Sequence, residues 1–355
     1  MEIGIYTFGD LPAHARGPQA AQQRLQEIVA AAKLADEAGL HVFGVGEHHR
    51  SDYAVSAHTV VLGALAAATR NIRLTSAVTI LSSADPVRVF EDFATLDLLS
   101  NGRAELMAGR GAFVESFPLF GFALQDYEAL YNEKLELLLQ LRDQERINWQ
   151  GQFRPALGGV EVAPRPLNPL PIWIGAGGTP QSAVRAGQAG LPLNLANIGG
   201  EPARFKPFID LYRKTGLAAG HAAADLKVAV SGHLHVQKDS QRARDEFFPH
   251  YTHYMRHNLP QRDVGWAISP ADYAQLASPR GSLFVGSPQE IADKILYEHE
   301  LFGHQRFLAQ IDIGGLPFAK VAQAIELLAG EVLPMVNNAL GTSAAQRADA
   351  VASPA

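Results

Sequence analysis

The sequence predicts a single (β/α)8 barrel, the α/β fold in which eight parallel strands alternate with helices around a closed sheet. Short apolar segments alternate with longer amphipathic segments along most of the 355 residues, without a break in composition. Polar and glycine-rich residues follow the apolar segments, and in this fold the active site lies at those strand ends. A two-domain, doubly wound α/β protein is the alternative that the same alternation leaves open.

Eight segments have the apolar and branched residues typical of buried parallel strands. They cover residues 2–8, 41–46, 72–81, 104–108, 171–174, 193–197, 226–236 and 306–313. Between them, apolar residues recur at the spacing of amphipathic helices. These helices are expected at 19–37, 57–69, 86–99, 127–141, 180–189, 202–215, 288–302 and 318–336. Ala38 and Gly39 end the first helix, and Pro86 opens the third at the first-turn position that proline tolerates.

Two stretches depart from this alternation. Residues 142–170 are irregular and rich in proline and glycine, whereas residues 240–282 are partly helical and rich in aromatic side chains and histidine. Within the second stretch, residues 247–257 are either a lid over the site or an ordinary surface helix. We expect one domain over 1–337 with these insertions, followed by a disordered tail rich in alanine and serine at 338–355.

The composition excludes several classes of protein. A net charge of −6 gives no basic footprint for nucleic acid, and 47% hydrophobic residues supply a large core. The absence of cysteine excludes disulfides, thiolate metal ligands and a thiol nucleophile, and it fits a cytoplasmic protein. The chain opens with no signal-like segment, and no apolar run reaches the roughly 18 residues that span a bilayer. We therefore expect a cytoplasmic protein that acts on neither membranes nor nucleic acid.

The second strand ends abruptly in Glu47, His48 and His49. Because side chains alternate along a strand, the two histidines are expected to face different surroundings. Imidazole changes charge near neutral pH, so this cluster indicates either chemistry or a solvated loop. Polar or glycine residues also follow the other strands, at positions that include Ser82, Arg110, Gly177, His233 and Asp312.

An anion site is expected where the fourth and fifth strands end. Arg110 stands between two glycines, and a guanidinium can bind phosphate oxygens in a fork. Gly177, Gly178 and Thr179 precede a helix whose first amides can hold a phosphate, and Ser182 can add a hydroxyl. The alternative is a simple helix cap, with Thr179 as the N-cap residue.

A metal-dependent barrel hydrolase is a competing interpretation. Its ligands would come from Glu47, His48, His233, His235 and Asp312, and the two histidines at 233 and 235 share one face of a strand. The first strand offers no ligand, however, and the fourth ends in a cation that a divalent metal would repel. We therefore expect no metal. His233 and His235 are either core residues or part of the substrate pocket.

A resemblance to a known family extends along most of the chain. It begins with EHHRSDYAVSAH and SAVTILSSADPVRVFEDFATLDLLSNGRAELMAGRG, and it resumes at PIWIGAGGTPQSAVRAGQAGLPL, FVGSPQEIADKI and FLAQIDIGGLPFAKVAQAIELLAGEVLP. The combination of EHH, the xxPxRxxEDxxxLDxxSxGR pattern and a closing RG resembles the bacterial luciferase-like flavin-dependent monooxygenases. Residues 111–170 and 240–280 match poorly.

The resemblance implies a cofactor and a mechanism. Members of this family are (β/α)8 barrels, commonly homodimers, that use O2 and reduced FMN from a separate flavin reductase to oxygenate a small organic substrate through a C4a-peroxyflavin. His48 takes the catalytic position beside the flavin, and Arg110 takes that of the arginine on the flavin phosphate. Ala77 and Val78 match a non-proline cis peptide packed against the flavin. The full cofactor-binding set expected here comprises Glu47, Ala77, Val78, Arg110, Gly177, Gly178, Thr179 and Ser182.

Some sequence features limit which activity and which cofactor are expected within this family. Gly109 stands where luciferase has a reactive cysteine, so neither thiol effects nor aldehyde-dependent light emission is predicted. Relatives that use the deazaflavin F420 usually lack the EHH pattern, which favours FMN. The chain has no GxGxxG after an early strand, so a partner reductase is favoured over a nicotinamide site of its own. A flavin-binding relative without turnover is the remaining alternative, and the sequence does not name the substrate.

Overall fold

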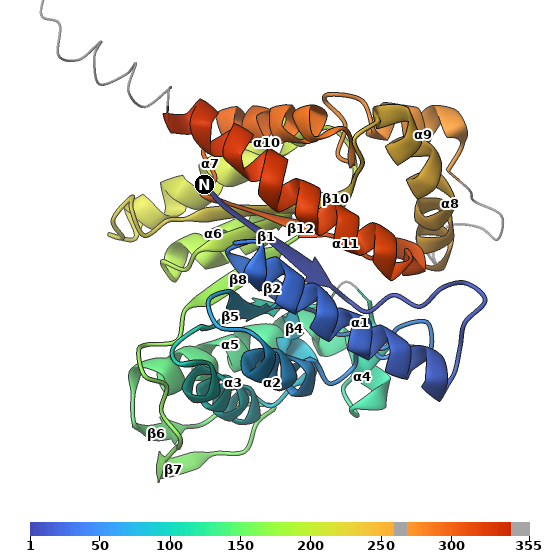
Figure 1. Ribbon diagram of the computed structural model, residues 1–355. Coiled ribbons are helices and arrows are strands. Elements are labelled where there is room, and N and C mark those ends of the chain that lie inside the picture. The colour runs from blue at the N-terminus through green and yellow to red at the C-terminus, as the bar shows by residue number, and fades with distance from the viewer. Residues whose placement is uncertain (112, 259–267, 342–355) are drawn as a thin grey trace, which may run out of the picture.

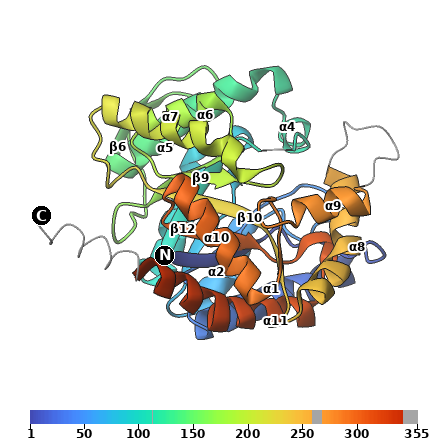
Figure 2. The same ribbon diagram turned by 90° about the horizontal axis from the view of Figure 1, so that it is seen from above.

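The protein, seen here in a computed structural model, is described over residues 1–111, 113–258 and 268–341. Within these residues eight parallel strands form a closed ring, because β9 pairs with β10 and β12 pairs with β1 (Figures 1 and 2). In ring order they are β1 (Glu2–Thr7), β2 (Val42–Val45), β3 (Arg73–Ser76), β5 (Ala104–Gly109), β8 (Ile172–Ala176), β9 (Leu193–Ala196), β10 (Val228–Val236) and β12 (Arg306–Gln310). The predicted (β/α)8 barrel is confirmed, and the two-domain alternative is wrong.

Helices surround the ring, as expected from the apolar spacing (Figure 2). They are α1 (Pro18–Glu37), α2 (His58–Ala68), α3 (Pro86–Ser100), α5 (Tyr127–Asp143), α6 (Pro180–Gln188), α7 (Lys206–Ala218), α10 (Pro288–Phe302) and α11 (Phe318–Leu327). A π-helical turn, η5 (Leu328–Val332), extends α11, and helix continues to residue 341. The first residues of the expected tail, 338–341, are therefore helical, and 342–355 lie outside the described residues.

Smaller elements complete the chain. They are the 3-10 turns η1 (Leu81–Ser83), η2 (Leu124–Asp126), η3 (Pro202–Phe205) and η4 (Ile313–Gly315), the helices α4 (Ser116–Leu119), α8 (Ser240–Asn258) and α9 (Pro270–Leu276), and the strands β6 (Arg146–Trp149), β7 (Leu157–Glu161) and β11 (Phe284–Gly286). Of these, α8 and α9 account for the helical character predicted within 240–282, and η3 begins the helix predicted at 202–215. Strands β6 and β7 pair as an antiparallel hairpin apart from the barrel. Across the described ranges no helix is long and apolar enough to cross a bilayer.

The third strand is not the continuous segment expected over 72–81. It breaks at a cis peptide between Ala77 and Val78, so β3 ends at Ser76 and a short β4 (Thr79–Ile80) pairs with β5. The cis peptide implied by the family resemblance is thus confirmed. Val78 lies over Gly109 and Gly175, where an added Cβ would come within 2.5 and 2.6 Å of its methyl groups. Glycine at both positions gives this turn of chain the room that it needs.

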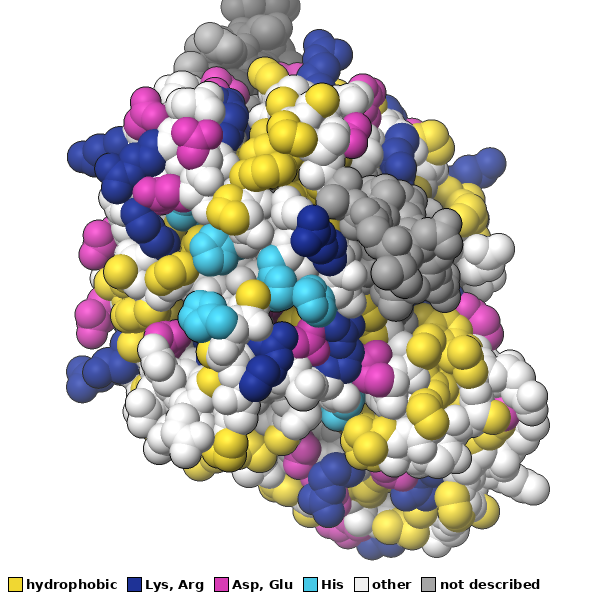
Figure 3. All heavy atoms as spheres, turned by 90° about the vertical axis from the view of Figure 1, so that its right-hand side faces the viewer, with side chains coloured by type: hydrophobic (Ala, Val, Ile, Leu, Met, Phe, Trp, Pro, Cys, Tyr) yellow, Lys and Arg dark blue, Asp and Glu magenta, His cyan; other side chains and the backbone are white. Residues whose placement is uncertain are grey.

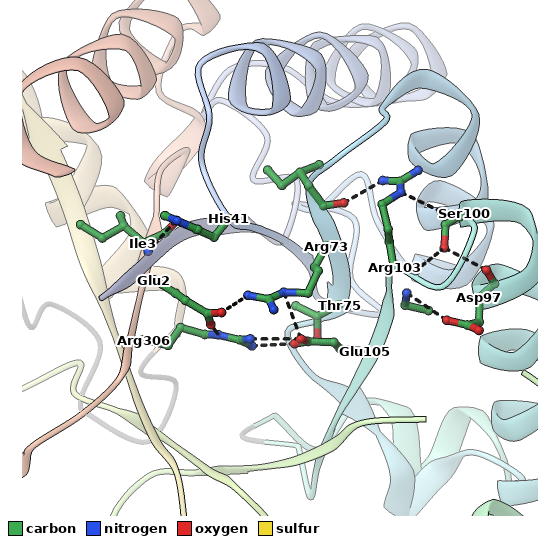
Figure 4. Close-up of polar contacts among 12 residues, drawn as sticks. Glu2, Ile3, His41, Arg73, Thr75, Asp97, Ser100, Arg103, Glu105 and Arg306 are labelled. Carbon is green, nitrogen blue, oxygen red and sulfur yellow. Dashed lines mark hydrogen bonds and ion pairs between the residues drawn. The ribbon is translucent and has the colours of Figure 1, made fainter. Parts of the chain in front are cut away.

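Much of the motif that carried the resemblance stabilises the fold. Asp85 caps α3 by accepting hydrogen bonds from the backbone N–H of Val87 and Arg88, and Asn101 ends the helix in the left-handed conformation. Asp97 accepts from the N–H of Ala104, while Arg103 donates to Ser100 and to the ends of α2 (Figure 4). These polar groups join α2, α3 and the start of β5.

The barrel interior separates into an apolar layer and a charged floor. Tyr6, Val42, Met107, Trp173 and Leu308 pack together inside the ring, whereas alternate residues of the same strands join the larger core under the helices. Below this layer, at the N-terminal strand ends, charged side chains replace the branched apolar residues that commonly fill such barrels.

The floor is a closed ring of alternating charges (Figure 4). Arg306 binds Glu105 through two hydrogen bonds of 2.6 and 3.0 Å and Glu2 through one of 2.8 Å. Arg73 pairs with the same two carboxylates, at 3.2 Å for Glu105. Burial alone would raise the pKa of Glu2, but Arg306 and Arg73 hold it below its ordinary value. The Arg306–Glu105 pair crosses the barrel, because β12 and β5 lie opposite each other in the ring.

Replacing Arg306 by methionine is expected to destabilise the protein by about 3–5 kcal/mol, because the buried Glu105 would lose both hydrogen bonds from Arg306 and keep only the partly exposed Arg73 as a charged partner. Arg88→Met is the matched control, since Arg88 forms only an exposed pair with Glu91 one helical turn away. Such a pair contributes roughly 0.3–0.5 kcal/mol. Urea unfolding followed by circular dichroism measures both. Equal losses in the two variants would contradict the role assigned to the floor.

Candidate functional site

His48 lies in an aromatic enclosure at the C-terminal end of the barrel. Its ring centroid is 4.5 Å from that of Phe8, 4.3 Å from Tyr53 and 4.7 Å from Phe113. Phe8 follows β1, Tyr53 follows β2 and Phe113 follows β5, so three strand ends build the enclosure. The imidazole is 5% exposed, and neither ring nitrogen has a hydrogen-bond partner among the described residues. A buried polar group without a partner is uncommon in a folded protein and is typical of a functional site.

Glu115, in the chain just before α4, is the charged group that faces His48. Its Oε1 lies 3.7 Å from the imidazole Nδ1, an ion-pairing distance that is too long for a hydrogen bond. Burial lowers the pKa of His48, and the Glu115 carboxylate offsets part of that shift. The imidazole is therefore neutral at pH 7. The carboxylate favours the tautomer that carries its proton on Nδ1, which leaves Nε2 able to accept a proton.

Glu47 supports the backbone beside the cis peptide. Its two carboxylate oxygens accept hydrogen bonds from the N–H of Ile80 at 2.7 Å and pair with His49 at 2.8 Å. His58 lies 3.6 Å from the same carboxylate and hydrogen-bonds Thr79. The two histidines of the EHH sequence thus face different surroundings, as the alternation predicts. The expected contact of Glu47 with the cofactor stays a prediction.

Arg110 and the glycine-rich loop after β8 come together as the sequence predicts. The guanidinium Nη2 donates to the hydroxyls of Thr179 at 3.1 Å and Ser182 at 3.2 Å, and these two hydroxyls lie 2.9 Å apart. Nη1 pairs with the carboxylate of Glu128 on α5. Arg185 on α6 binds the other oxygen of that carboxylate at 2.9 Å. Arg110 and Arg185 therefore share the carboxylate of Glu128, and Arg110 also binds the two hydroxyls.

The loop between β8 and α6, which lies next to Arg110, leaves open space at Gly177. Thr179 is the N-cap residue of α6, yet its side chain caps no backbone amide, because the hydroxyl is bonded to Arg110 and Ser182. Gly178 has a φ of +98°, a conformation that favours glycine, whereas a Cβ added at Gly177 would meet open space. Thr179 and Pro180 thus take the positions of the helix-cap interpretation, but the Thr179 hydroxyl binds Arg110 instead of a backbone amide.

Helix α8 packs its aromatic face toward the barrel. Phe247 and Tyr251 are fully buried, whereas Arg256 and His257 are exposed. A helix with one buried face fits both predictions for residues 247–257, a lid over the site and a surface helix. His233 is buried against Tyr251 and Tyr254, and His235 stacks on Phe247. Burial lowers the pKa of His233 to about 3, so this imidazole stays neutral.

The structure does not assemble the ligand set of the metal-dependent alternative. His235 turns to Glu246 at 3.3 Å, and both nitrogens of His233 lack a polar partner. Asp312 accepts a hydrogen bond from Thr7 instead. Across residues 1–111, 113–258 and 268–341, no three His, Asp or Glu side chains are grouped as metal ligands.

Sequence reasoning named His48, and it named Arg110 together with its hydroxyl partners Thr179 and Ser182, but it missed the residues around His48. Glu115 and Phe113 lie in a loop without periodicity, and no residue pattern points to them.

Phe8 is the last residue of the first predicted strand, and Tyr53 follows the second, so their positions carried a usable signal. The resulting arrangement offers an anion cradle on one side and a neutral, enclosed proton acceptor on the other.

Comparisons with known proteins agree with this arrangement. The family model described as luciferase-like monooxygenase matches residues 1–305. The flavin-dependent trigonelline monooxygenase, oxygenase component, of Acinetobacter baylyi is 24% identical over 89% of this chain and 91% of its own length. The solved structure of monooxygenase RslO1 from Streptomyces bottropensis has a TM-score of 0.82 at 26% identity, covering 94% of this chain and 99% of that chain.

A second solved structure shares the fold at lower identity. The oxygenating constituent of 3,6-diketocamphane monooxygenase from Pseudomonas putida, in complex with FMN, has a TM-score of 0.74 at 20% identity and covers 94% of this chain and 98% of that chain. F420-dependent proteins are also among the matches. The comparisons therefore indicate a flavin-type cofactor without separating FMN from F420.

Glu115→Gln is expected to lower the pKa of His48 further, because the substitution removes the negative charge that favours the imidazolium. A titration of the histidine side-chain NMR signals measures this shift. Glu128→Gln is the matched control, since it removes a carboxylate that pairs with Arg110 and not with His48. An unchanged or raised pKa of His48 in the Glu115 variant would exclude the electrostatic coupling.

Proposed function

Because the chain belongs to the luciferase-like monooxygenase family, we propose that it is an FMN-dependent monooxygenase. In this proposal it uses reduced FMN and O2 to oxygenate a small organic substrate. The observation that carries the proposal is the pairing of two features at the C-terminal strand ends. One is the cradle of Arg110, Thr179 and Ser182, and the other is the enclosed His48 with both nitrogens unpartnered.

The residues present fit a flavin phosphate. Arg110 offers charged donors, Thr179 and Ser182 offer hydroxyls, and the open space at Gly177 admits a bulky group. Glu128 already occupies one donor face of Arg110 with an anion, which supports an anionic ligand there. In the proposal these residues hold the phosphate, and Ala77 and Val78 pack against the flavin ring.

In the proposal, the cofactor and the protein supply different parts of the reaction chemistry. Reduced FMN supplies the two electrons with which O2 is activated. His48 Nε2 exchanges a proton with the reacting groups, while Glu115 holds the imidazole in one tautomer. Phe8, Tyr53 and Phe113 exclude water from the imidazole, which protects reactive oxygen species from unproductive breakdown.

The same proposal implies a partner enzyme and a second copy of this protein. We infer that a separate flavin reductase supplies reduced FMN, a view supported by the relative named as an oxygenase component. We also infer a cytoplasmic homodimer that joins through α2 and α3. Val60 and Leu99 on these helices are 72% and 63% exposed, which leaves apolar surface for a second copy. F420 is the alternative cofactor.

Arg110→Ala is expected to weaken binding of reduced FMN by about 10- to 100-fold, because charge-assisted hydrogen bonds contribute roughly 1.5–3 kcal/mol. His48→Ala is expected to leave FMN binding nearly unchanged and to uncouple O2 consumption from substrate oxygenation. Anaerobic fluorescence titration measures binding, and oxygen uptake with peroxide detection measures uncoupling. The same titration with F420 separates the two cofactors.

Glu128→Gln is a control that is expected to change FMN affinity in the opposite direction. Since Glu128 competes for Arg110, its neutralisation is expected to tighten FMN binding modestly. Arg142→Gln removes an arginine that pairs only with the adjacent Asp143, and it is expected to change nothing. The proposal fails if wild-type protein binds neither cofactor, or if Arg110→Ala and Arg142→Gln bind FMN equally well.

A further inference from the structure

A second cavity lies beside the barrel end that holds His48. It has a volume of 860 Å³, within the range of small-molecule sites, and it lies between the start of α1, the middle of α8 and the start of α11. Figure 3 looks onto this side of the molecule, where histidine side chains gather next to Lys or Arg side chains. The proposed cofactor residues do not line this cavity.

A buried arginine lines the cavity. Arg24 is 4% exposed, and its Nε, which is itself buried, has no hydrogen-bond partner among the described residues. Nη1 lies 3.2 Å from Glu27, and Nη2 donates to the carbonyl of Leu316 at 3.2 Å. Nearby, the exposed Arg16 uses Nη1 for the carbonyls of Pro12 and Ala15. An anion in the cavity would therefore bind Arg24 through its Nη groups, in competition with Glu27.

Two helix N-termini point their positive ends at the same cavity. The first residues of α1 and α11, including Gln19 and Phe318, line it. Neither helix has a side-chain cap or an acidic residue in its first turn. The first N–H groups of a helix lack intrahelical acceptors and carry a partial positive charge, which attracts anions.

Nearby carboxyls offset this positive charge only in part. Burial raises the pKa of both Asp10 and Asp312, and the charge of Asp312 raises that of Asp10 further. Asp10 accepts from the N–H of Gly314, and Asp312 accepts from Thr7. Asp10 and Asp312 do not line the cavity, and Glu27 is the acidic group among its described lining residues.

Two arginines and one carboxylate line the cavity, namely Arg16, Arg24 and Glu27. His253 is a further lining residue, and burial lowers its pKa. The remaining wall includes Pro249, Phe318 and several alanines, which suit an apolar body attached to the anionic group.

The cavity adjoins the enclosure of His48. His253 and Gly314 line both the large cavity and a small space bounded by Tyr53 and Tyr254. The Tyr53 ring is 4.3 Å from His48. A molecule anchored in the large cavity would therefore lie one aromatic side chain away from the proposed proton acceptor.

We propose that this cavity binds a small organic anion, a carboxylate or phosphate on an apolar body, between Arg24, Arg16 and the N-termini of α1 and α11. Resting on the proposed function, the inference assigns the substrate to the class of organic anions, with the charged end anchored here and the oxidised end directed toward His48.

The test compares benzoate with its uncharged analogue benzamide by isothermal titration calorimetry. Benzoate is expected to bind at least about tenfold more tightly, because only the carboxylate can pair with the arginines. Gln19→Glu places a negative charge at the cavity and is expected to weaken benzoate binding roughly tenfold. An acid at a helix N-terminus does not destabilise the helix, so this variant folds. Arg16→Gln should also weaken binding.

Gln22→Glu is the matched control, because it adds the same charge to the same helix at an exposed residue outside the cavity. It should bind benzoate like the wild type, and so should Arg110→Ala, which excludes binding at the cofactor cradle. Equal binding of benzoate and benzamide, or unchanged benzoate binding in Gln19→Glu, overturns the proposal.

Anaerobic FMN titration of the same variants separates this proposal from the function. FMN binding without benzoate binding refutes the anion site alone. Benzoate binding without binding of FMN or F420 leaves an anion site but refutes its role as a substrate anchor.

Discussion

The ion pair between Arg306 and Glu105 constrains the whole barrel, because it joins strands on opposite sides of the ring. Glu2 and Arg73 complete a closed square of alternating charge, so that β1, β3, β5 and β12 share one layer at the floor. Taking these charges out of water is costly, and apolar residues could fill the same space with equal stability. The square of charges instead fixes the register of the strands that carry it. A one-residue slip of β12 would turn Arg306 out of the interior and leave the buried Glu105 with Arg73 as its remaining partner.

A fixed floor permits irregularity at the other end of the barrel. There the backbone leaves regular strand geometry between Ala77 and Val78, and glycines at 109 and 175 make room for it. Glu47 holds the chain that follows through the N–H of Ile80. Charged groups at the floor are paired with one another, whereas His48 at the mouth retains both nitrogens without a partner. This contrast is how a barrel separates stability from chemistry.

The sequence predicts those features of the structure that are marked by residues close together in the chain. Alternating apolar segments, the proline at 86 and the glycine-rich strand ends are local, so the barrel, its helices and the Arg110 cradle could all be predicted. The break at Val78 came only through the family resemblance, because an apolar run reads as one strand. Glu115 and the cavity of Arg24 were not predicted, since they depend on loops brought together by folding, and no periodicity marks such contacts. The hairpin of β6 and β7 was missed because its strands have only four and five residues and no residue of β7 is buried.

The order of the strands around the barrel determines where the proposed cofactor and substrate would bind. Arg110 and the Thr179 loop follow β5 and β8, whereas the anion cavity lies beyond β1 and β12 on the opposite side of the ring. His48 follows β2, and Val78 lies over the glycines of β5 and β8. A cofactor anchored by its phosphate at one side and a substrate anchored by its charge at the other would both direct their reactive ends to the centre. Two separate anion anchors hold two molecules in a fixed mutual orientation, and such positioning lowers the entropic barrier to their reaction. The arrangement thus makes the anionic end of the substrate a means of orientation as well as recognition.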